Sequence, residues 1–356
     1  MSRVAHSRSA DSWRLSSSPM TSGSRECDVL ITGASGFIGG EMARRLAQGG
    51  RRIAGFDLPG RPSTHLHEAG VRLVEGDVTS AGDCSRVLES CRPGAVVHCA
   101  AAMGSSTPAE EFMRVNLEGT RTLASAAAAA GVKRFIFISS VTVHGMPADD
   151  RITEETPCGS IGLPYADSKI AAESVLRELH EQGRIALTIL RPADVYGPRS
   201  GEWVIKLVEA LRGGRMILIG GGRGLINLTY VDNLTDAAEA CLGTDRSLGQ
   251  AYLITDGSPV TWRAYLSDLA AAASAPPPRI SVPEILARPL VAGMEAVFPL
   301  LGRRPPLGRM GLRLLTSRSI YRIDKARSEL GWSPGVGYSD GMRRVAQWIR
   351  REMPAS

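Results

Sequence analysis

The chain has 356 residues, 43% hydrophobic and 22% charged, which is ordinary for a soluble globular protein of one large or two modest domains. The net charge of +6 would suit an anionic partner, but the arginines concentrate in residues 1–25 and 303–351 without interleaved aromatic residues, which argues against a nucleic-acid groove. The six cysteines form no C-x-x-C pair and have no histidine at metal spacing, so we expect reduced thiols, a cytoplasmic protein and no metal site.

Residues 1–25 are rich in serine and arginine and lack the apolar core of a secretory signal. Their composition is also that of a transit peptide, but we expect a disordered basic extension.

The first ordered pattern is a short apolar strand, 27–32, followed by a glycine-rich turn and a helix through residue 46. The turn has the spacing G-x-x-G-x-x-G, with Gly33, Gly36 and Gly39, and it includes Phe37 and Ile38. Glycines between a strand and a helix start let the backbone approach a pyrophosphate, which the helix N-terminus stabilises. The turn therefore predicts a dinucleotide site.

A second strand, 52–56, ends in Asp57, which follows Gly33 by 24 residues. A carboxylate at about this interval binds the 2′-hydroxyl of an adenosine ribose and repels a 2′-phosphate. Leu58 supplies no arginine to accept that phosphate, so we expect NAD rather than NADP. The alternative is a capping aspartate in a turn before Pro59.

The strand–helix pattern then repeats. Strand 71–75 is followed by Asp77 and Val78, and strand 95–98 by the small residues Ala100 and Ala101, which leave room for a cofactor ring at the strand ends. Asp77 is placed to bind an adenine amino group or, equally, to cap a helix.

Helix 109–130 carries Asn116, and strand 134–138 ends in Ser139 and Ser140. Alternating strands and helices with short links predict an α/β fold, a Rossmann doubly wound parallel sheet with right-handed crossovers. We expect it to occupy residues 26–190. A smaller, mainly helical substrate-binding region, 191–350, would be interleaved with the last strands, before a tail at 351–356.

Tyr165 and Lys169 lie four positions apart in the predicted helix 165–182, so they share one helix face. A free phenol titrates near 10, and a lysine charge one turn away, with a cationic nicotinamide nearby, favours the phenolate. The pair therefore predicts a general base. The alternative is a surface tyrosine beside a solvated lysine.

Beyond this helix we expect strands at 185–190, 216–219 and 251–255, a strand and helix over 228–242, a helix at 262–273 and a proline linker at 276–278. Residues 282–301 are apolar but contain three charges and three prolines, so they fall short of a membrane span. They predict either a lid helix over an apolar pocket, with at most peripheral membrane contact, or a core-packed helix.

Six segments, in this order, resemble the extended short-chain dehydrogenase/reductase superfamily over roughly residues 27–350. They are Thr32–Gly39, Gly76–Val78, His98–Ala101, Ser139–Gly145, Tyr165 with Lys169, and Arg191–Pro198. The resemblance implies that Ser140, Tyr165 and Lys169 are catalytic, that Lys169 also binds the nicotinamide ribose, and that Asn116 supports the site. It implies a cofactor site of Gly33, Gly36, Phe37, Ile38, Gly39, Asp57, Asp77, Val78, Ala100, Ala101, Asn116, Ser139, Tyr165, Lys169, Pro192 and Val195, and a homodimer through helices 109–130 and 165–182.

Within the superfamily, dehydratases place an Asp-Glu pair where this chain has Val141 and Thr142, neither of which is an acid or base. Epimerases commonly carry a phosphate-binding arginine where this chain has Ile226, although Arg223 lies three residues earlier. Together with the apolar 282–301 segment, residues 227–234 and 249–262 look more like the 3β-hydroxysteroid dehydrogenase branch.

That branch implies an NAD(P)-dependent oxidoreductase that interconverts a secondary alcohol and a ketone on a hydrophobic, steroid-like or lipid-like small molecule. We expect its substrate to contact Thr142, His144 and Ile226. The family often has tyrosine at the position of His144. The alternatives are an NAD-dependent nucleotide-sugar epimerase, supported by the shared ending 321–332, and a non-catalytic NAD-binding scaffold.

Overall fold

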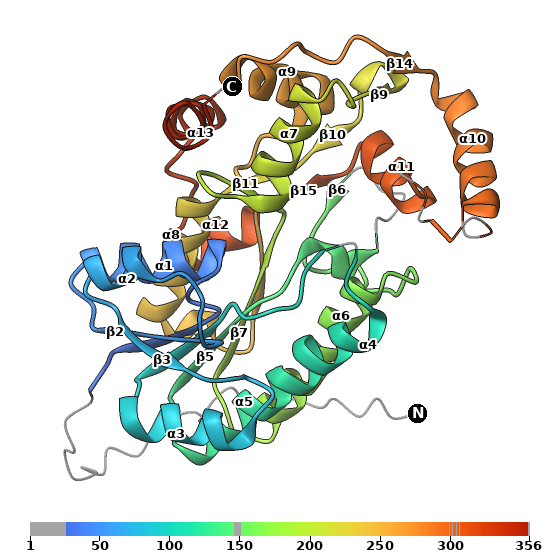
Figure 1. The fold of residues 1–356 in the computed structure, drawn as a ribbon. Coiled ribbons are helices and arrows are strands. Elements are labelled where there is room, and N and C mark those ends of the chain that lie inside the picture. Colours follow the sequence, from blue (N-terminus) through green and yellow to red (C-terminus); the bar gives the residue numbers. More distant parts are fainter. Residues whose placement is uncertain are drawn as a thin grey trace, which may run out of the picture.

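The computed structural model describes residues 26–104, 106–145, 151–298, 300, 302–303, 305 and 307–354. The predicted basic extension, residues 1–25, lies outside the described residues. Figure 1 shows a sheet between two layers of helices in the lower half of the view and the C-terminal region above it.

The central sheet has seven parallel strands in the order β12-β7-β5-β4-β1-β2-β3. Their bounds are β1 Val29–Thr32, β2 Ile53–Asp57, β3 Arg72–Glu75, β4 Ala95–His98, β5 Arg134–Ile138, β7 Leu187–Pro192 and β12 Ala251–Ile254. β1 and β4 are buried along their whole length, because helices cover both faces of a parallel sheet. The predicted Rossmann fold is confirmed, and β12 shows that the last strand comes from the second half of the chain.

Each face of the sheet carries its own hydrophobic core. On one face pack α1 (Phe37–Gln48), α8 (Val231–Gly243) and α12 (Asp324–Leu330), and on the other α3 (Ala81–Cys91), α5 (Thr120–Ala129) and α6 (Pro164–Glu181). α1 buries Met42, Ala43 and Leu46, which recur at helical spacing. The Ser80 hydroxyl caps α3 by accepting the backbone N–H of Asp83.

The helix expected over residues 109–130 is interrupted. The chain forms α4 (Ala109–Phe112), a π-helix η1 (Met113–Gly119) and then α5. Asn116 lies in the π-helical part and is buried. π-helical turns inside α-helices are rare overall, and those that occur are often found at functional sites.

The C-terminal region is built around a third core. It contains η3 (Gly201–Ile205), α7 (Lys206–Arg212), α9 (Trp262–Ala272) and α13 (Tyr338–Glu352), which pack around Tyr196, Tyr230 and Tyr265. It also contains the short strand pairs β8 (Asp194–Tyr196) with β11 (Leu228–Tyr230), β10 (Leu225–Ile226) with β13 (Val260–Thr261), and β9 (Leu218–Ile219) with β14 (Ser281–Val282). The pair β6 (Arg151–Ile152) with β15 (Ile320–Tyr321) links it to an earlier part of the chain. The remaining elements are α2 (Thr64–Glu68), η2 (Val141–His144), η4 (Gly220–Gly222), η5 (Asp245–Ser247), α10 (Glu284–Val297) and α11 (Arg309–Thr316).

The segment expected at 282–301 forms the helix α10, which begins after Pro283 and contains Pro289. Across the part of the chain that the structure describes, no helix is both long and apolar enough to span a bilayer.

Candidate active site

The glycine-rich turn joins β1 to α1 by very close backbone packing. Gly33 has φ +65°, and a Cβ there would lie 2.8 Å from the Cα of Ala100 at the end of β4. A Cβ on Gly39 would lie 2.3 Å from the carbonyl oxygen of Gly33. Only glycine fits either position. The turn therefore brings the α1 N-terminus to the carboxyl edge of the sheet, where a pyrophosphate would be held by backbone N–H groups.

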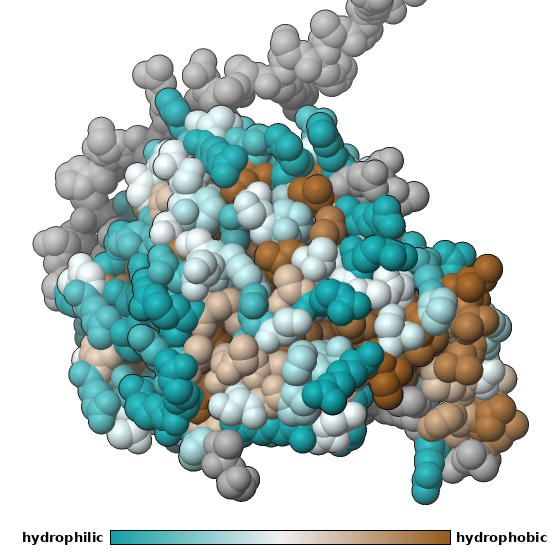
Figure 2. All heavy atoms as spheres, turned by 90° about the horizontal axis from the view of Figure 1, so that it is seen from above, coloured by the Kyte–Doolittle hydropathy of each residue, from teal (hydrophilic) through white to brown (hydrophobic). Residues whose placement is uncertain are grey.

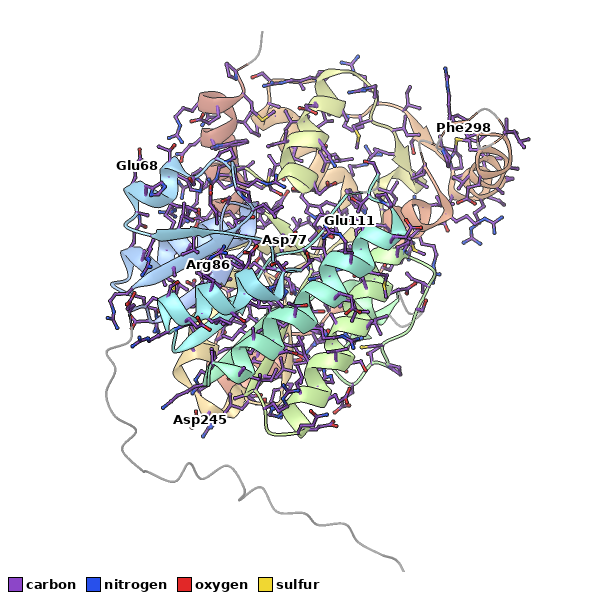
Figure 3. All side chains as sticks on the ribbon, turned by 60° about the horizontal axis from the view of Figure 1, so that its bottom comes forward. Glu68, Asp77, Arg86, Glu111, Asp245 and Phe298 are labelled. Carbon is purple, nitrogen blue, oxygen red and sulfur yellow. The ribbon has the colours of Figure 1, made fainter. Side chains whose placement is uncertain are left out.

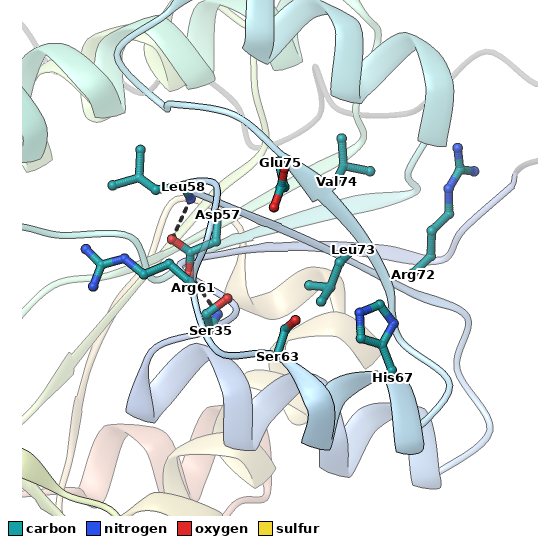
Figure 4. Close-up of a pocket in the computed structure, with 10 residues that line it drawn as sticks. All are labelled: Ser35, Asp57, Leu58, Arg61, Ser63, His67, Arg72, Leu73, Val74 and Glu75. Atoms are coloured by element: carbon teal, nitrogen blue, oxygen red, sulfur yellow. Dashed lines mark hydrogen bonds between the residues drawn. The ribbon is translucent and has the colours of Figure 1, made fainter.

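Asp57 stands at the end of β2, beside a cavity of about 490 Å³. Its carboxylate accepts the backbone N–H groups of Ser35, at 2.7 Å, and Leu58, at 2.8 Å. Figure 4 shows Ser35 and Arg61 around this carboxylate, and the cavity is also lined by Ser63. The glycine turn and this carboxylate fit the adenosine half of a dinucleotide. Arg61, four residues after Asp57, also lines the cavity and supplies a cation there. The sequence argument considered only position 58 and did not identify it.

Asp77 makes local contacts. Its carboxylate accepts the backbone N–H of Thr79 at 2.8 Å and lies 3.7 Å from the guanidinium of Arg114. This bond stabilises the turn before α3 and is not a helix cap, because Ser80 is the N-cap of α3, and an adenine contact stays a prediction. Val78 is buried beneath it and faces Gly119 of η1.

A chain of buried hydrogen bonds runs under the ends of β1 and β4. The Thr120 hydroxyl donates to the Asn116 carbonyl, so the His98 Nε2 must donate to Thr120, at 2.9 Å. The other ring nitrogen, Nδ1, then accepts the Thr32 hydroxyl at 2.6 Å, and Thr32 in turn accepts the Ala100 N–H. Burial lowers the His98 pKa from 6.5 to about 3, which keeps the ring neutral.

Asn116 extends this chain of hydrogen bonds to α6. Its side-chain oxygen accepts the Ala102 N–H at 2.7 Å, and its amide nitrogen donates to the Ala102 carbonyl and to the Ser168 hydroxyl. Ser168 donates to the carbonyl of Tyr165. Asn116 thus fixes the small-residue loop after β4 relative to α6, and its support of a catalytic site stays a prediction.

The structure brings Ser140, Tyr165 and Lys169 together. Ser140 follows β5 and lies within hydrogen-bonding reach of the partly exposed Tyr165 phenol. Lys169 is 2% exposed, donates to the Ile138 carbonyl at 2.8 Å and lies 4.6 Å over the Phe137 ring. One N–H of the ammonium is used in this way, which leaves two for a ribose hydroxyl or the phenol. Thr142 donates its hydroxyl to Ser140 at 3.0 Å.

The phenol pKa differs from the expectation that a neighbouring lysine lowers it. Burial raises the Tyr165 pKa from 10.0 to about 12, although the Ser140 hydroxyl lowers it in part. Burial also lowers the Lys169 pKa to about 8, because the ammonium loses solvation that the nearby Cys99 and Glu173 restore only in part. In the protein by itself the i,i+4 pair therefore does not activate the base, since the ammonium is turned toward a backbone carbonyl.

A buried ion pair lies directly behind Ser140. Glu173 receives two bonds from Arg191, at 2.9 and 2.6 Å, and accepts the Ser139 hydroxyl at 2.6 Å. Glu173 and Arg191 are 4% and 3% exposed. Arg177 adds a longer contact of 3.5 Å. Since Glu173 lies one turn after Lys169 on α6, this ion pair connects α6 to the ends of β5 and β7.

Two of the expected substrate residues are buried in the protein interior. His144 is 3% exposed, donates Nδ1–H to the Thr156 carbonyl at 2.9 Å and accepts Arg191 at 3.2 Å through Nε2. Ile226 is completely buried in the third core. The structure therefore does not support a substrate contact from either residue, because tertiary packing turns both side chains inward. Thr142, beside Ser140, is compatible with one.

The remaining expected cofactor residues lie around the same edge of the sheet. Phe37 and Ile38 form the first turn of α1 and pack against the first core, and Ala101 is partly exposed after β4. Pro192 ends β7, and Val195 is buried in β8. Thr32, His98, Ser168, Glu173 and Arg191 complete the support of the site. No spacing in the sequence assigns them a role, since their partners are distant in the chain.

The two buried histidines make stability depend on pH. Burial lowers the His144 pKa from 6.5 to about 4, helped by the Arg191 charge. The unfolded chain binds these protons more readily, so the stability is fully present above about pH 6.5 and is lost as the pH falls toward the folded values. We expect the free energy of unfolding to fall by up to about 1.4 kcal/mol per pH unit for each histidine below that pH.

Urea denaturation between about pH 7 and pH 5 measures this slope. His144→Gln should flatten it, whereas His67→Gln, which changes an exposed histidine, should not. Equal slopes in both variants would mean that carboxylates carry the effect.

The comparisons with known proteins agree with this geometry. The model of the NAD-dependent epimerase/dehydratase family matches residues 29–254. The chain is 30% identical to a 2-alkyl-3-oxoalkanoate reductase of Stenotrophomonas maltophilia, over 89% of this chain and 98% of the relative. It is 29% identical to the human decarboxylating sterol-4-alpha-carboxylate 3-dehydrogenase, over 92% and 88%.

Among solved structures, the UDP-glucose 4-epimerase of Thermus thermophilus in complex with NAD superposes with a TM-score of 0.73. It is 25% identical, and the match covers 92% of this chain and all of the epimerase. The chain therefore belongs to the NAD-dependent epimerase/dehydratase family, as an NAD-dependent dehydrogenase or epimerase of the extended short-chain dehydrogenase/reductase type.

Proposed function

We propose that the protein is an NAD-dependent dehydrogenase that interconverts a secondary alcohol and a ketone on a hydrophobic, steroid-like or lipid-like substrate. The observation that carries the proposal is Tyr165, a partly exposed residue whose phenol has the Ser140 hydroxyl as its neighbour, at the sheet edge that holds the glycine turn. A non-catalytic NAD-binding scaffold does not require a general base, so it does not require a tyrosine at this position beside a serine.

Each residue then has a defined role. Tyr165 removes the hydroxyl proton of the alcohol, and Ser140 donates a hydrogen bond to the same oxygen. Lys169 holds its ammonium close to the site and stabilises the phenolate when it forms. Bound NAD would supply the hydride acceptor at C4 of its nicotinamide. Asn116 holds the backbone at Ala102, and Glu173 holds Ser139, the residue before Ser140.

A hydrophobic substrate is favoured over a nucleotide sugar by residue 226. Isoleucine there is wholly buried, so this position offers no cation to a diphosphate. Arg223 lies on the surface of the loop before it. The two relatives named above act, by their names, on an oxoalkanoate and on a sterol carboxylate. The epimerase stays the second candidate because of the match to a UDP-glucose 4-epimerase over nearly the whole chain.

A substrate panel tests the choice. Purified protein is incubated with NAD⁺ and hydroxysteroids or long-chain 3-hydroxy acids and, separately, with UDP- and dTDP-sugars. NADH formation with the first set supports the dehydrogenase. Sugar interconversion without net NADH formation would replace it by the epimerase, and tight NAD binding with no turnover would replace both by the scaffold.

The preference for NAD over NADP is proposed on Asp57, whose carboxylate would repel a 2′-phosphate. We expect Asp57→Ala to weaken NAD binding about tenfold or more and to improve NADP relative to NAD, because Arg61 lines the same cavity. Kd values for both coenzymes, from quenching of intrinsic fluorescence, measure this. Arg61→Ala is the matched variant, and in the Asp57→Ala background it should remove the gain in NADP binding. An unchanged NAD to NADP ratio in Asp57→Ala would place the ribose elsewhere.

We further propose a homodimer through η1, α5 and α6. These elements pack against one another, and Figure 3 shows the helices of this face side by side in front of the sheet. Light scattering of the purified protein tests the subunit number.

A cytoplasmic location also stays a proposal, supported by six cysteines that are all free thiols.

A further inference from the structure

Helix α10 lies at the margin of the molecule and packs inward through only one narrow face. Ala287 and Val291 are each 1% exposed and form a small core with Leu312 of α11 and Ile219 of β9. This core is separate from the three larger ones. Figure 1 shows α10 at the outer edge of the C-terminal region, and Figure 3 shows Phe298, the residue after it, at the same margin.

The outward side of α10 is apolar, which is unusual for a helix in water. Leu286, Leu290 and Val297, at spacings of four and seven, are 57%, 58% and 51% exposed, and Ile285 is 81% exposed. Residues at these spacings form one stripe along a helix. Leu300 continues the stripe at 85% exposure. Figure 2 shows the brown side chains gathered at this end of the molecule. A contiguous apolar surface of this kind marks an interaction site.

Both acidic side chains of α10 are neutralised by arginine. Glu284 pairs with Arg288 at 2.8 Å, and Glu295 pairs with Arg309 of α11 at 2.9 Å. The whole segment 279–318 contains seven arginines and only these two acidic residues, a net charge of +5. Further arginines, at 279, 303, 313 and 318, are exposed on both sides of the apolar stripe in the sequence. The segment that carries the exposed apolar stripe therefore has a net positive charge.

We propose that α10 is a docking surface for an anionic lipid membrane, on which the helix lies parallel to the surface with its apolar stripe among the acyl chains. An apolar stripe with arginines beside it is the arrangement by which a helix binds in the plane of a membrane interface, and anionic headgroups attract the arginines. A second copy of this chain is the less suitable occupant, because an isologous contact would bring the same arginine-rich segments together. The inference stands independently of the proposed catalytic function.

Co-sedimentation of the full-length protein with vesicles tests the proposal. We expect binding to phosphatidylcholine vesicles with about one third phosphatidylglycerol, weaker binding when salt is raised, and little binding to phosphatidylcholine alone. Leu286→Gln with Leu290→Gln should reduce the partition coefficient about tenfold or more. Arg279→Gln with Arg303→Gln should reduce it on the anionic vesicles by about fivefold per arginine.

The matched control is Met103→Gln, which changes a large apolar residue, 54% exposed, outside α10 and outside the elements proposed for the dimer. It should bind vesicles like the unchanged protein. Thermal unfolding of every variant verifies that the fold is retained.

Absence of vesicle binding, or binding that is equal in the α10 variant and in the control, overturns the proposal. So does a dimer that the Leu286→Gln, Leu290→Gln variant dissociates while no variant binds vesicles, because α10 would then be an interface between copies. Neither result bears on NADH formation in the substrate panel, so the two proposals fail separately.

Discussion

Replacing Tyr165 by phenylalanine is expected to lower the turnover number by about 10³-fold or more while NAD binding stays within a few-fold of the unchanged protein. The substitution removes only the hydroxyl that neighbours Ser140. It keeps the ring, which contacts Phe112 edge-on at 5.9 Å between centroids, so α4 and α6 should remain packed. Steady-state NADH formation and the Kd for NAD, measured on the same preparation, separate the chemical effect from binding.

Tyr338→Phe is the matched control, because it also removes a tyrosine hydroxyl, one that donates to Asp268 at 2.6 Å on the far side of the C-terminal region. We expect it to turn over like the unchanged protein. If Tyr165→Phe kept wild-type rates, another group would have to be the base.

The rate of alcohol oxidation by the unchanged protein should rise with pH, because a phenol with a raised pKa must lose its proton to act.

Replacing Glu173 by glutamine is expected to cost about 3–5 kcal/mol of unfolding free energy, because it leaves the guanidinium of Arg191 buried without its counter-ion. It also loosens the Ser139 hydroxyl and with it the backbone that carries Ser140. We therefore expect kcat to fall while KM changes little. Urea denaturation gives the midpoint of unfolding. The slope of the unfolding free energy against urea concentration should stay unchanged if the folded state keeps its compactness.

Glu178→Gln provides the matched control on the same helix, since Glu178 is exposed and bonds only Gln182 among the described contacts. It should change stability by less than about 0.5 kcal/mol. Glu173→Met combined with Arg191→Met should recover most of the lost stability, because the double variant leaves no buried charge. A Glu173→Gln protein as stable as the unchanged one would show that the ion pair carries no net stabilisation.

The sequence determined the parts of this protein that depend on local pattern. Alternating apolar strands and helices predicted the parallel sheet, since burial on both faces leaves a continuous apolar signature in strands such as β1. The turn around Gly33 and Gly39 was predictable because no other residue fits those backbone positions. Tyr165 and Lys169 lie on one face of α6 because a helix places residues four apart together.

The surroundings of those residues depend on contacts between distant parts of the chain. Glu173 and Arg191 are 18 positions apart, and His144 and Arg191 are 47 apart, so no local period brings them together. His144 and Ile226 became interior residues because the elements packed over them close off the solvent. Packing also set the direction of the Tyr165 pKa, since desolvation of the phenol outweighs the effect of the Ser140 hydroxyl, and the Lys169 ammonium is bound to the Ile138 carbonyl. Spacing in the chain fixes which side chains share an element, whereas burial and hydrogen-bond partners depend on elements far away in sequence.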